Sequence, residues 1–357
     1  MLPTPKLFLI CIMLFSWRLE GYSQLNQPIK NFEILWSTFD ERYANFELKG
    51  IDWDSVYATY RPQITTQTGD RELFSICCQM LQTLSDGHVS IEAEHPSGEW
   101  DCGPPYDFSL ETAFPTDSAQ ASFKAVMDKS LEAHGFSAPI HKELSEDTRF
   151  QYRLSDSFGY LRLDEMTEDI HFLKFPKAMD EAIAAFQSKS AIIIDLRFNG
   201  GGFDHTSHMM ARRLIREETF YLERRRRKGT LTYTSLRTRR IKPRRKGTFS
   251  KPIVILTSDY TASAAEVFLL LMKDLDHVTL IGDDSEGIFS DTFEFRLPNK
   301  WEVSLSHQQY FSQDQTNYEG KGIPVDIQIK NSPQDLLSQK DSVIEAAIKY
   351  LSDNMDN

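Results

Sequence analysis

Several features are scarce or absent in this sequence of 357 residues. It has only four cysteines, and its N-terminal apolar run, residues 7–17, is too short to cross a bilayer as a helix. Neither of the glycine patterns that bind nucleotide phosphates, GxGxxG and Gly-Lys-Ser/Thr, is present. The net charge of −12 argues against general nucleic-acid binding. With 357 residues, the chain is long enough to bury a large core.

The N-terminus predicts export. Lys6 precedes the apolar run, and small or polar residues follow it to Gln24, which is the layout of a signal peptide over residues 1–23. Cys11 lacks the small preceding residue that a lipoprotein signal needs, so we expect no lipid anchor. After removal of the signal, the sequence predicts no membrane span and a periplasmic or extracellular location.

Three cysteines would remain in the mature chain: Cys77, Cys78 and Cys102. The adjacent pair would lie on different flanks of a helix and could not readily bridge each other. Cys102 could pair with either of them in an oxidising compartment. We interpret His205 and His208 as surface residues of a helix, and we predict neither a metal site nor a cofactor.

Ser263 stands between a predicted buried strand, residues 252–258, and an apolar helix that extends to about residue 275. A serine at such a junction is often only a helix N-cap. The same position also exposes a hydroxyl beside the helix N-terminus, where the amide of Ala264 could stabilise an oxyanion. The sequence therefore makes Ser263 a candidate nucleophile.

A second segment, residues 191–203, predicts a buried strand that ends in three glycines. Glycine accepts a positive φ and a close approach, so the amides of this loop could point at a reacting carbonyl. Two other loops carry titratable groups. His88 follows a turn after an apolar helix, and Glu319 lies in a glycine-bracketed loop before the last predicted strand.

Together these segments resemble the tail-specific, or C-terminal processing, serine peptidase family over residues 32–351. The resemblance rests on five motifs in the family's order: 84–88 (Leu-Ser-Asp-Gly-His), 194–202 (Ile-Asp-Leu-Arg-Phe-Asn-Gly-Gly-Gly), 261–266 (Thr-Ala-Ser-Ala-Ala-Glu), 281–287 (Ile-Gly-Asp-Asp-Ser-Glu-Gly) and 319–326 (Glu-Gly-Lys-Gly-Ile-Pro-Val-Asp). It implies a serine endopeptidase that acts on peptide or protein substrates.

The family uses two catalytic arrangements, a Ser/Lys dyad and a Ser-His-Glu triad. Ile288 stands where the lysine of the dyad would fall, and no lysine lies between Lys273 and Lys300. The resemblance to the tricorn-like branch therefore implies Ser263 as nucleophile, His88 as general base and acid, and Glu319 as the orienting carboxylate. It also implies an oxyanion hole formed by the amides of Gly201 and Ala264.

Several alternatives stay open. Gly87 precedes the histidine where tricorn-like proteases carry a serine, and Asp86 could replace Glu319 as the orienting acid. The chain could instead be a binding module that does not catalyse, or an esterase, although Ser263 lacks the flanking glycines of Gly-x-Ser-x-Gly. The basic stretch 224–246 fits a solvated edge hairpin, or else a docking surface for an acidic partner. The oligomeric state is left undecided.

The predicted fold class is α/β (α+β), a layered peptidase core with a small N-terminal helical domain. We predict helices near 28–43, 53–60 and 71–84 within a domain spanning 24–91. Residues 92–150 are expected to be an irregular connection with one helix near 119–134 and no intact PDZ domain. The core, 151–357, is expected to alternate strands and helices, with later antiparallel strands near 292–297 and 301–305 and one C-terminal helix over 334–351.

Overall fold

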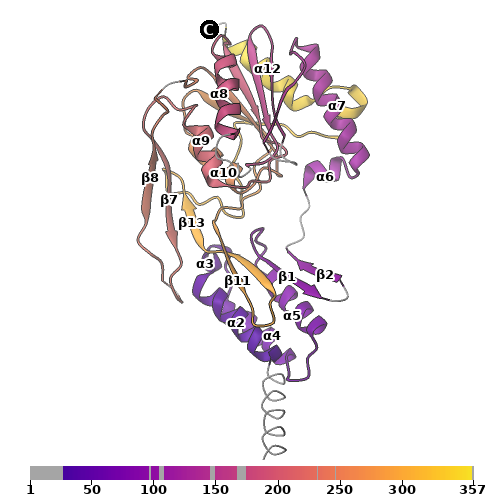
Figure 1. Cartoon of the computed structure of the whole chain (residues 1–357), viewed down its shortest axis with the longest axis vertical. Helices are drawn as coiled ribbons and strands as arrows, with labels where there is room; N and C mark the ends of the chain where they lie inside the picture. The colour runs from indigo at the N-terminus through magenta and orange to yellow at the C-terminus, as the bar shows by residue number, and fades with distance from the viewer. Residues whose placement is uncertain are drawn as a thin grey trace, which may run out of the picture. The chain divides into compact units, whose positions relative to one another are not determined.

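The computed structural model describes residues 27–95, 98–103, 108–144, 149–166, 174–230, 232–245 and 247–355. The predicted signal peptide, with Cys11, lies outside them. The described chain forms two compact units (Figure 1). Unit 1 contains the residues before Pro105 together with Arg226–Thr234 and Asp291–Gln308, and unit 2 contains Tyr106–Arg225, Ser235–Ser290 and Gln309–Asn357.

The helices of unit 1 follow the predicted apolar spacing. They are α2 (Gln27–Arg42), α3 (Phe46–Lys49), α4 (Trp53–Tyr60), the short 3-10 helix η1 (Arg61–Gln63) and α5 (Asp70–Gln82). Asp52 caps α4 by accepting a hydrogen bond from the amide of Ser55 at 3.2 Å. The three predicted helices are confirmed, and the single turn of α3 was not predicted.

An antiparallel sheet completes unit 1, in the order β11-β12-β1-β2. Its strands are β1 (Ser90–His95), β2 (Gly98–Cys102), β11 (Thr292–Arg296) and β12 (Glu302–Ser306). The antiparallel pairing of β11 with β12 is confirmed. These two strands join β1 rather than the sheet of unit 2, because their apolar face packs into the aromatic core of unit 1.

A disulfide ties the helical part of unit 1 to its sheet. Cys78 of α5 bonds to Cys102 of β2, with their Cα atoms 5.8 Å apart. Cys77 stays a free thiol on the buried flank of α5. Burial raises the pKa of Cys77 to about 12. The structure thus selects one of the two pairings that the sequence allowed.

Unit 2 is built on a seven-stranded sheet in the order β14-β10-β9-β6-β5-β4-β3. The first five strands are parallel, and β4 and β3 extend the sheet antiparallel. The strands are β3 (Ile140–Glu143), β4 (Arg149–Leu154), β5 (Phe158–Leu163), β6 (Ala191–Asp195), β9 (Ile253–Thr257), β10 (Val278–Gly282) and β14 (Ile327–Gln328). This mixed sheet confirms the predicted α/β class.

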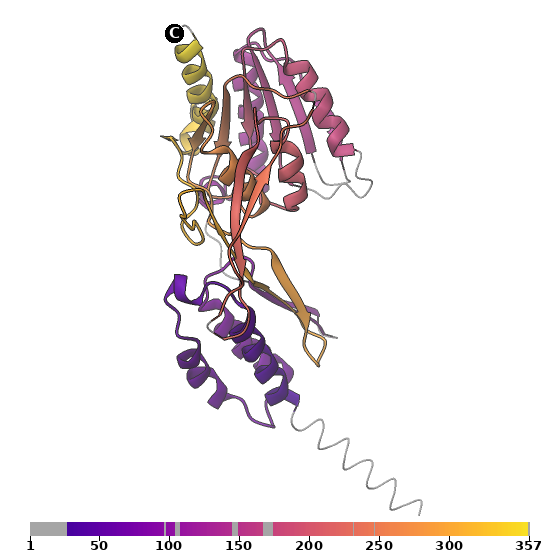
Figure 2. The ribbon, with the colours of Figure 1, turned by 90° about the vertical axis from the view of Figure 1, so that its left-hand side faces the viewer.

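The central strands of this sheet carry apolar side chains on both of its faces. Helices therefore cover both faces. One face packs on α8 (Lys174–Phe186), α9 (Asp204–Ala211) and α10 (Ala264–Met272). The other packs on α6 (Ser109–Ala113), α7 (Asp117–Ala133) and α12 (Ser342–Met355). Figure 2 shows α8 and α12 on opposite sides of the sheet.

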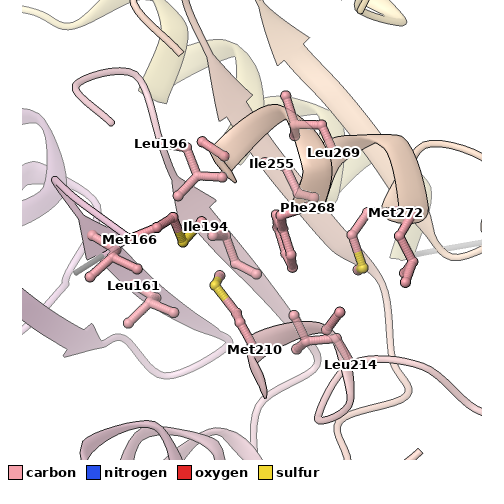
Figure 3. Packing of buried hydrophobic residues seen from close by; sticks show 14 of the residues in the cluster. Leu161, Met166, Ile194, Leu196, Met210, Leu214, Ile255, Phe268, Leu269 and Met272 are labelled. Carbon is pink, nitrogen blue, oxygen red and sulfur yellow. The ribbon is translucent and has the colours of Figure 1, made fainter. Parts of the chain in front are cut away.

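The core behind the predicted nucleophile consists of buried apolar side chains. Figure 3 shows Leu161, Ile194 and Ile255 of the sheet beside Phe268 and Leu269 of α10. Every residue of α10 is buried. Because the helix has no solvent-facing side, its N-terminus is fixed in place against the strand ends.

The basic stretch forms an edge hairpin. Strands β7 (Thr219–Arg226) and β8 (Arg237–Ile241) pair antiparallel, and β13 (Gln308–Phe311) joins β7 on its other side. The residues of β8 are exposed except for Ile241. An edge strand rich in arginine resists pairing with a further chain, which agrees with the solvated-hairpin interpretation.

Two expectations about secondary structure were wrong. The region expected to be an irregular connection with one helix contains strands β2 and β3, and it contains α6 in addition to the predicted helix α7. The single C-terminal helix is two helices, α11 (Pro333–Ser338) and α12, separated by Gln339 with φ of 54°. Asp341 ends the break by accepting hydrogen bonds from the amides of Val343 and Ile344. None of the described helices is long and apolar enough to span a membrane.

Candidate active site

Ser263 occupies a strained turn between β9 and α10. Its backbone has φ of 53° and ψ of −120°, whereas an ordinary N-cap residue has an extended backbone. A positive φ in a residue with a side chain costs energy and persists only where its surroundings enforce it. The strain therefore marks Ser263 as more than a helix cap.

The glycine loop packs directly against this turn. A Cβ added at Gly201 would lie 2.6 Å from the Cβ of Ser263 and 3.1 Å from the amide nitrogen of Ala264. Gly201 has φ of 107°, so a residue with a side chain would be both strained and in collision. The structure thus brings together Ser263, Ala264 and Gly201, three of the predicted site residues.

Hydrogen bonds join the two loops. The amide of Ala262 donates to the carbonyl of Asn199 at 3.1 Å, and the hydroxyl of Thr261 donates to that of Leu196 at 2.9 Å. The side chain of Asn199 accepts from the amide of Gly201 at 3.0 Å. These contacts fix the register of the glycine loop on the Ser263 turn.

A buried ionic network lies at the start of the glycine loop. Arg197 donates to both carboxylate oxygens of Asp195, at 3.0 and 2.7 Å, and to Asp341 at 2.9 Å. It also donates to Asn331, and the hydroxyl of Tyr160 donates to Asp195 at 2.7 Å. Burial acts to raise the pKa of Asp195, but Arg197, Arg162 and the hydroxyl of Tyr160 together outweigh it, so the pKa lies below its usual value.

Glu266 connects the Ser263 turn to a neighbouring loop. Its fully buried carboxylate accepts from the amides of Ser263, Gly287 and Ile288, at 3.1, 2.7 and 2.7 Å, and from the hydroxyl of Ser285 at 2.6 Å. Burial raises the pKa of Glu266 to about 7, and these hydrogen bonds oppose the rise. Four converging donors match an ionised carboxylate, which accepts without donating.

Glu319 holds the next residue of that same loop. Its side chain is 3% exposed and accepts from the amide of Phe289 at 2.7 Å. Ile288, bound by Glu266, directly precedes Phe289. The buried carboxylates of Glu266 and Glu319 therefore accept hydrogen bonds from adjacent amides. These bonds link the position of Glu319 to that of the Ser263 turn within unit 2.

His88 belongs to unit 1, where Asp86 organises its turn. The carboxylate of Asp86 accepts from the amide of His88 at 2.9 Å and from the hydroxyls of Tyr43 and Ser306, at 2.9 and 3.0 Å. Burial lowers the pKa of His88 below its ordinary value, while Asp86 and Asp291 oppose the shift. Asp86 thus anchors the backbone that carries the imidazole.

The sequence analysis missed the part played by Glu266. Its signal was present, because a glutamate three residues after a helix-capping serine is the capping-box pattern. The hydrogen bond from the amide of Phe289 to Glu319 could not be predicted from a local sequence pattern, since the two residues lie in different loops. Among the described residues, no group of three or more His, Cys, Asp or Glu side chains could hold a metal ion.

Two parts of the chain match known families. Residues 157–329, which include the glycine loop, the Ser263 turn and Glu319, match peptidase family S41. Residues 27–82 match the C1 domain of tricorn protease. Residues 157–329 thus form a domain of peptidase family S41, the tail-specific or C-terminal processing serine peptidases. This match confirms the resemblance inferred from the five motifs.

Curated relatives of this chain are considerably longer. The tricorn protease of Thermoplasma acidophilum is 28% identical over 210 residues, which are 57% of this chain and 18% of that protein. The carboxy-terminal-processing protease of Bartonella bacilliformis is 26% identical over 197 residues, which are 54% of this chain and 43% of that protein. The chain thus spans less than half the length of either relative.

Solved structures share the fold over most of the chain. A protein of Parabacteroides merdae aligns with a TM-score of 0.71 and 26% identity, over 91% of this chain and 96% of that one. Mature CPAF aligns with a TM-score of 0.64 and 12% identity, over 88% and 95% of the two chains. The second likeness shows the fold alone.

Proposed function

We propose that this protein is a serine endopeptidase with a Ser-His-Glu triad. Ser263 is the nucleophile, His88 is the general base and then the general acid, and Glu319 orients and supports the imidazole. The amides of Gly201 and Ala264 form the oxyanion hole. The match to family S41 and the placement of a strained serine against the glycine loop support this assignment.

In the acylation step, the hydroxyl oxygen of Ser263 attacks the carbonyl carbon of the scissile peptide bond, and His88 takes the hydroxyl proton. The carbonyl π electrons move to oxygen, where the two amides stabilise the negative charge. The tetrahedral intermediate then expels the amine, which receives the proton from His88. The products of this step are a free amine and an ester on Ser263.

In the deacylation step, a water molecule replaces the amine. His88 takes a proton from the water, whose oxygen attacks the ester carbonyl, and then returns a proton to the oxygen of Ser263 as the ester breaks. An oxyanion-hole donor typically contributes about 10²- to 10³-fold to kcat. The close packing of Gly201 against Ser263 and against the amide nitrogen of Ala264 is the observation that supports the proposal. The amide of Gly201 donates to the side chain of Asn199, so in the proposed reaction it exchanges this acceptor for the oxyanion.

The decisive experiment is labelling of the full-length chain with a fluorophosphonate, followed by digestion of a proteome-derived peptide library. We expect labelling and cleavage with the unaltered protein and neither with Ser263→Ala. Ser250→Ala is the matched control, because Ser250 is an exposed serine on the loop before β9. It should retain both activities.

The outcomes separate the alternatives. A folded protein with neither labelling nor Ser263-dependent cleavage at neutral pH would favour the binding module. Labelling with hydrolysis of esters but not of peptides would favour the esterase. Cleavage that survives Ser263→Ala would remove Ser263 from the mechanism.

The proposed location is the periplasm or the cell exterior. Residues 1–23 have the composition of a signal peptide. The Cys78–Cys102 disulfide supports export, because such bonds persist mainly in oxidising compartments. Fractionation of cells that produce the full-length chain, with N-terminal sequencing of the product, tests this. A protein that keeps residue 1 and stays in the cytoplasm would contradict the proposal.

A further inference from the structure

A cavity of about 170 Å³ lies in unit 2 beside the glycine loop. Most of its lining comes from α6 and α7, the segment for which the sequence suggested no substrate-binding module. Three further residues complete it: Asp164, which follows β5, Phe198, which precedes the glycine loop, and Tyr260, which precedes the Ser263 turn. The cavity therefore joins a peripheral helix pair to the proposed catalytic loops.

The floor of the cavity is apolar and rigid. The rings of Phe114 and Phe123 are stacked, with centroids 4.2 Å apart, and both side chains are buried. Leu110 is buried beside them. An apolar ligand group entering here would leave water for a preformed hydrophobic surface, which is the main driving force for binding of this kind.

The aromatic walls are held by neighbouring side chains. The guanidinium of Arg162 lies 4.8 Å from the ring centroid of Phe198, and the ammonium of Lys124 lies 5.2 Å from it. The ring of Phe108 packs edge-on against Tyr260 at 5.0 Å. Because both aromatic walls are fixed in this way, little ordering is needed when a ligand binds.

Two contacts place the cavity close to the reacting bond. A Cβ added at Gly200 would lie 3.4 Å from the ring of Tyr260, whereas one added at Gly201 would lie 2.6 Å from the Cβ of Ser263. Adjacent residues of the glycine loop therefore face the cavity wall and the nucleophile. An extended peptide advances about 3.3–3.6 Å per residue, so the cavity lies within about two residues of the scissile bond.

The size and charge of the cavity define its ligand. An apolar cavity of about 150 Å³ accommodates one benzene molecule, so this one suits a single phenyl-sized group. Its rim carries charges of both signs, and Asp164 is held by Arg162 through two hydrogen bonds, at 2.6 and 2.9 Å. Among the charged lining residues, this leaves Glu111 and Lys124, whose charges are opposite in sign.

We infer that this cavity is a substrate subsite for one aromatic or large aliphatic side chain, within two residues of the cleaved bond. The inference rests on the proposed peptidase function, and it assigns substrate selection to α6 and α7. The principal competing ligand is a basic side chain, because four acidic residues act, after burial, to raise the pKa of Tyr260: Glu111, Glu286, Asp164 and Glu165.

The test uses a peptide found by library digestion and synthesised in four versions. One position near the cleaved bond carries Phe, Leu, Ala or Lys, and each position within two residues of the bond is varied in turn. We expect one position where kcat/KM for Phe and Leu exceeds that for Ala by at least about tenfold. Preference for Lys at that position would overturn the inference.

A variant that fills the cavity provides the structural control. Gln120 lies on α7 at the cavity, so Gln120→Trp should occupy it and reduce the Phe-to-Ala preference to about twofold or less. Ala125→Trp, on an exposed position of the same helix, should keep the preference. An unchanged preference in Gln120→Trp would contradict the assignment.

A binding measurement separates this inference from the proposed function. Calorimetry with Ser263→Ala protein should show tighter binding of the Phe peptide than of the Ala peptide, and Gln120→Trp should remove the difference. Fluorophosphonate labelling without any such difference in binding or cleavage leaves the peptidase proposal intact and refutes the subsite. Selective binding without labelling refutes catalysis and leaves the cavity as a peptide-binding site.

Discussion

The two loops that would supply the oxyanion-hole amide of Gly201 and the base His88 are stabilised in opposite ways. The glycine loop of unit 2 starts from Arg197, whose guanidinium is fully buried between Asp195 and Asp341. The His88 turn of unit 1 starts from Asp86, whose partners are hydroxyl groups and a backbone amide. The first arrangement is ionic, and the second is neutral apart from one carboxylate.

This difference indicates what each loop must do. Amides that stabilise an oxyanion contribute only if they are fixed before the reaction. A buried ion pair fixes a loop firmly, since removing one partner leaves an uncompensated charge. An imidazole that exchanges protons needs a neighbourhood that does not hold it permanently charged. Burial lowers the pKa of His88 below its ordinary value, although Asp86 and Asp291 oppose the shift.

The largest effect should separate the two carboxylates near these loops. Glu319→Gln keeps an oxygen for the amide of Phe289 but loses the charge that supports the imidazolium, so we expect kcat/KM to fall by about 10⁴-fold. Asp86→Asn should lower activity less and should destabilise unit 1. Kinetics and urea unfolding of both variants check this. The reverse pattern would make Asp86 the orienting acid.

The ionic anchor can be broken directly. Arg197→Leu leaves Asp195 and Asp341 buried without their cation, so the free energy of unfolding should fall by about 3–5 kcal/mol. Arg216→Leu is the matched control, because its 3.0 Å pair with Asp276 is exposed and should contribute about 0–1 kcal/mol. Urea unfolding measures both. Equal losses would mean that burial does not distinguish these pairs.

Unit 1 is stabilised by a disulfide, whereas unit 2 is stabilised by the buried ion pairs of Arg197. Cys102→Ser opens the loop closed by the disulfide and should lower the free energy of unfolding by about 2–4 kcal/mol. A reductant should act on the unaltered protein in the same direction. Cys77→Ala controls for loss of a buried sulfur, and its response to reductant should be unchanged. Insensitivity of the unaltered protein would show that the bond is absent.

The smallest effect is a change in the pH profile. His88 must be neutral to act as base, so kcat/KM should rise with pH through an apparent pKa below 6.5, the usual histidine value. Glu266, with a pKa of about 7, gains a proton as pH falls, and its protonated form cannot accept from all four donors. Both groups should therefore shape the acid limb.

Glu266→Gln sharpens this prediction. On a logarithmic plot the acid limb should have a slope near two in the unaltered protein and near one in the variant, because one titrating group is gone. The overall rate should also fall, since an amide nitrogen would face amide donors. A slope of one in both proteins would exclude Glu266 from the profile.

Local patterns predicted most of the fold. Helices α2, α4 and α5 follow apolar spacing, and the strands beside Asp195 and Thr257 follow β-branched runs. The break before α12 was not predictable, because Asp341 caps that helix and also binds Arg197, far away in the sequence. The pairing of β12 with β1 was likewise hidden, since no local pattern specifies a partner about 200 residues distant.

The same distinction between local patterns and long-range contacts applies to the candidate site. The motifs around Gly201 and Ser263 predicted two adjacent loops, and the structure places them in contact. The triad assignment of His88 and Glu319 stays a prediction from family resemblance. Glu266 and Glu319 accept hydrogen bonds from the amides of residues 288 and 289. These bonds were not predictable, because no sequence pattern indicates which buried backbone amides a glutamate binds.

The buried thiol of Cys77 has a consequence for how the protein matures. A neighbouring thiolate would attack the Cys78–Cys102 bond and interchange its partners, since exchange proceeds through the deprotonated sulfur. With its pKa raised to about 12, roughly one Cys77 in 10⁵ is deprotonated at neutral pH. Once folded, the chain therefore resists disulfide scrambling, although the competing cysteine is the very next residue.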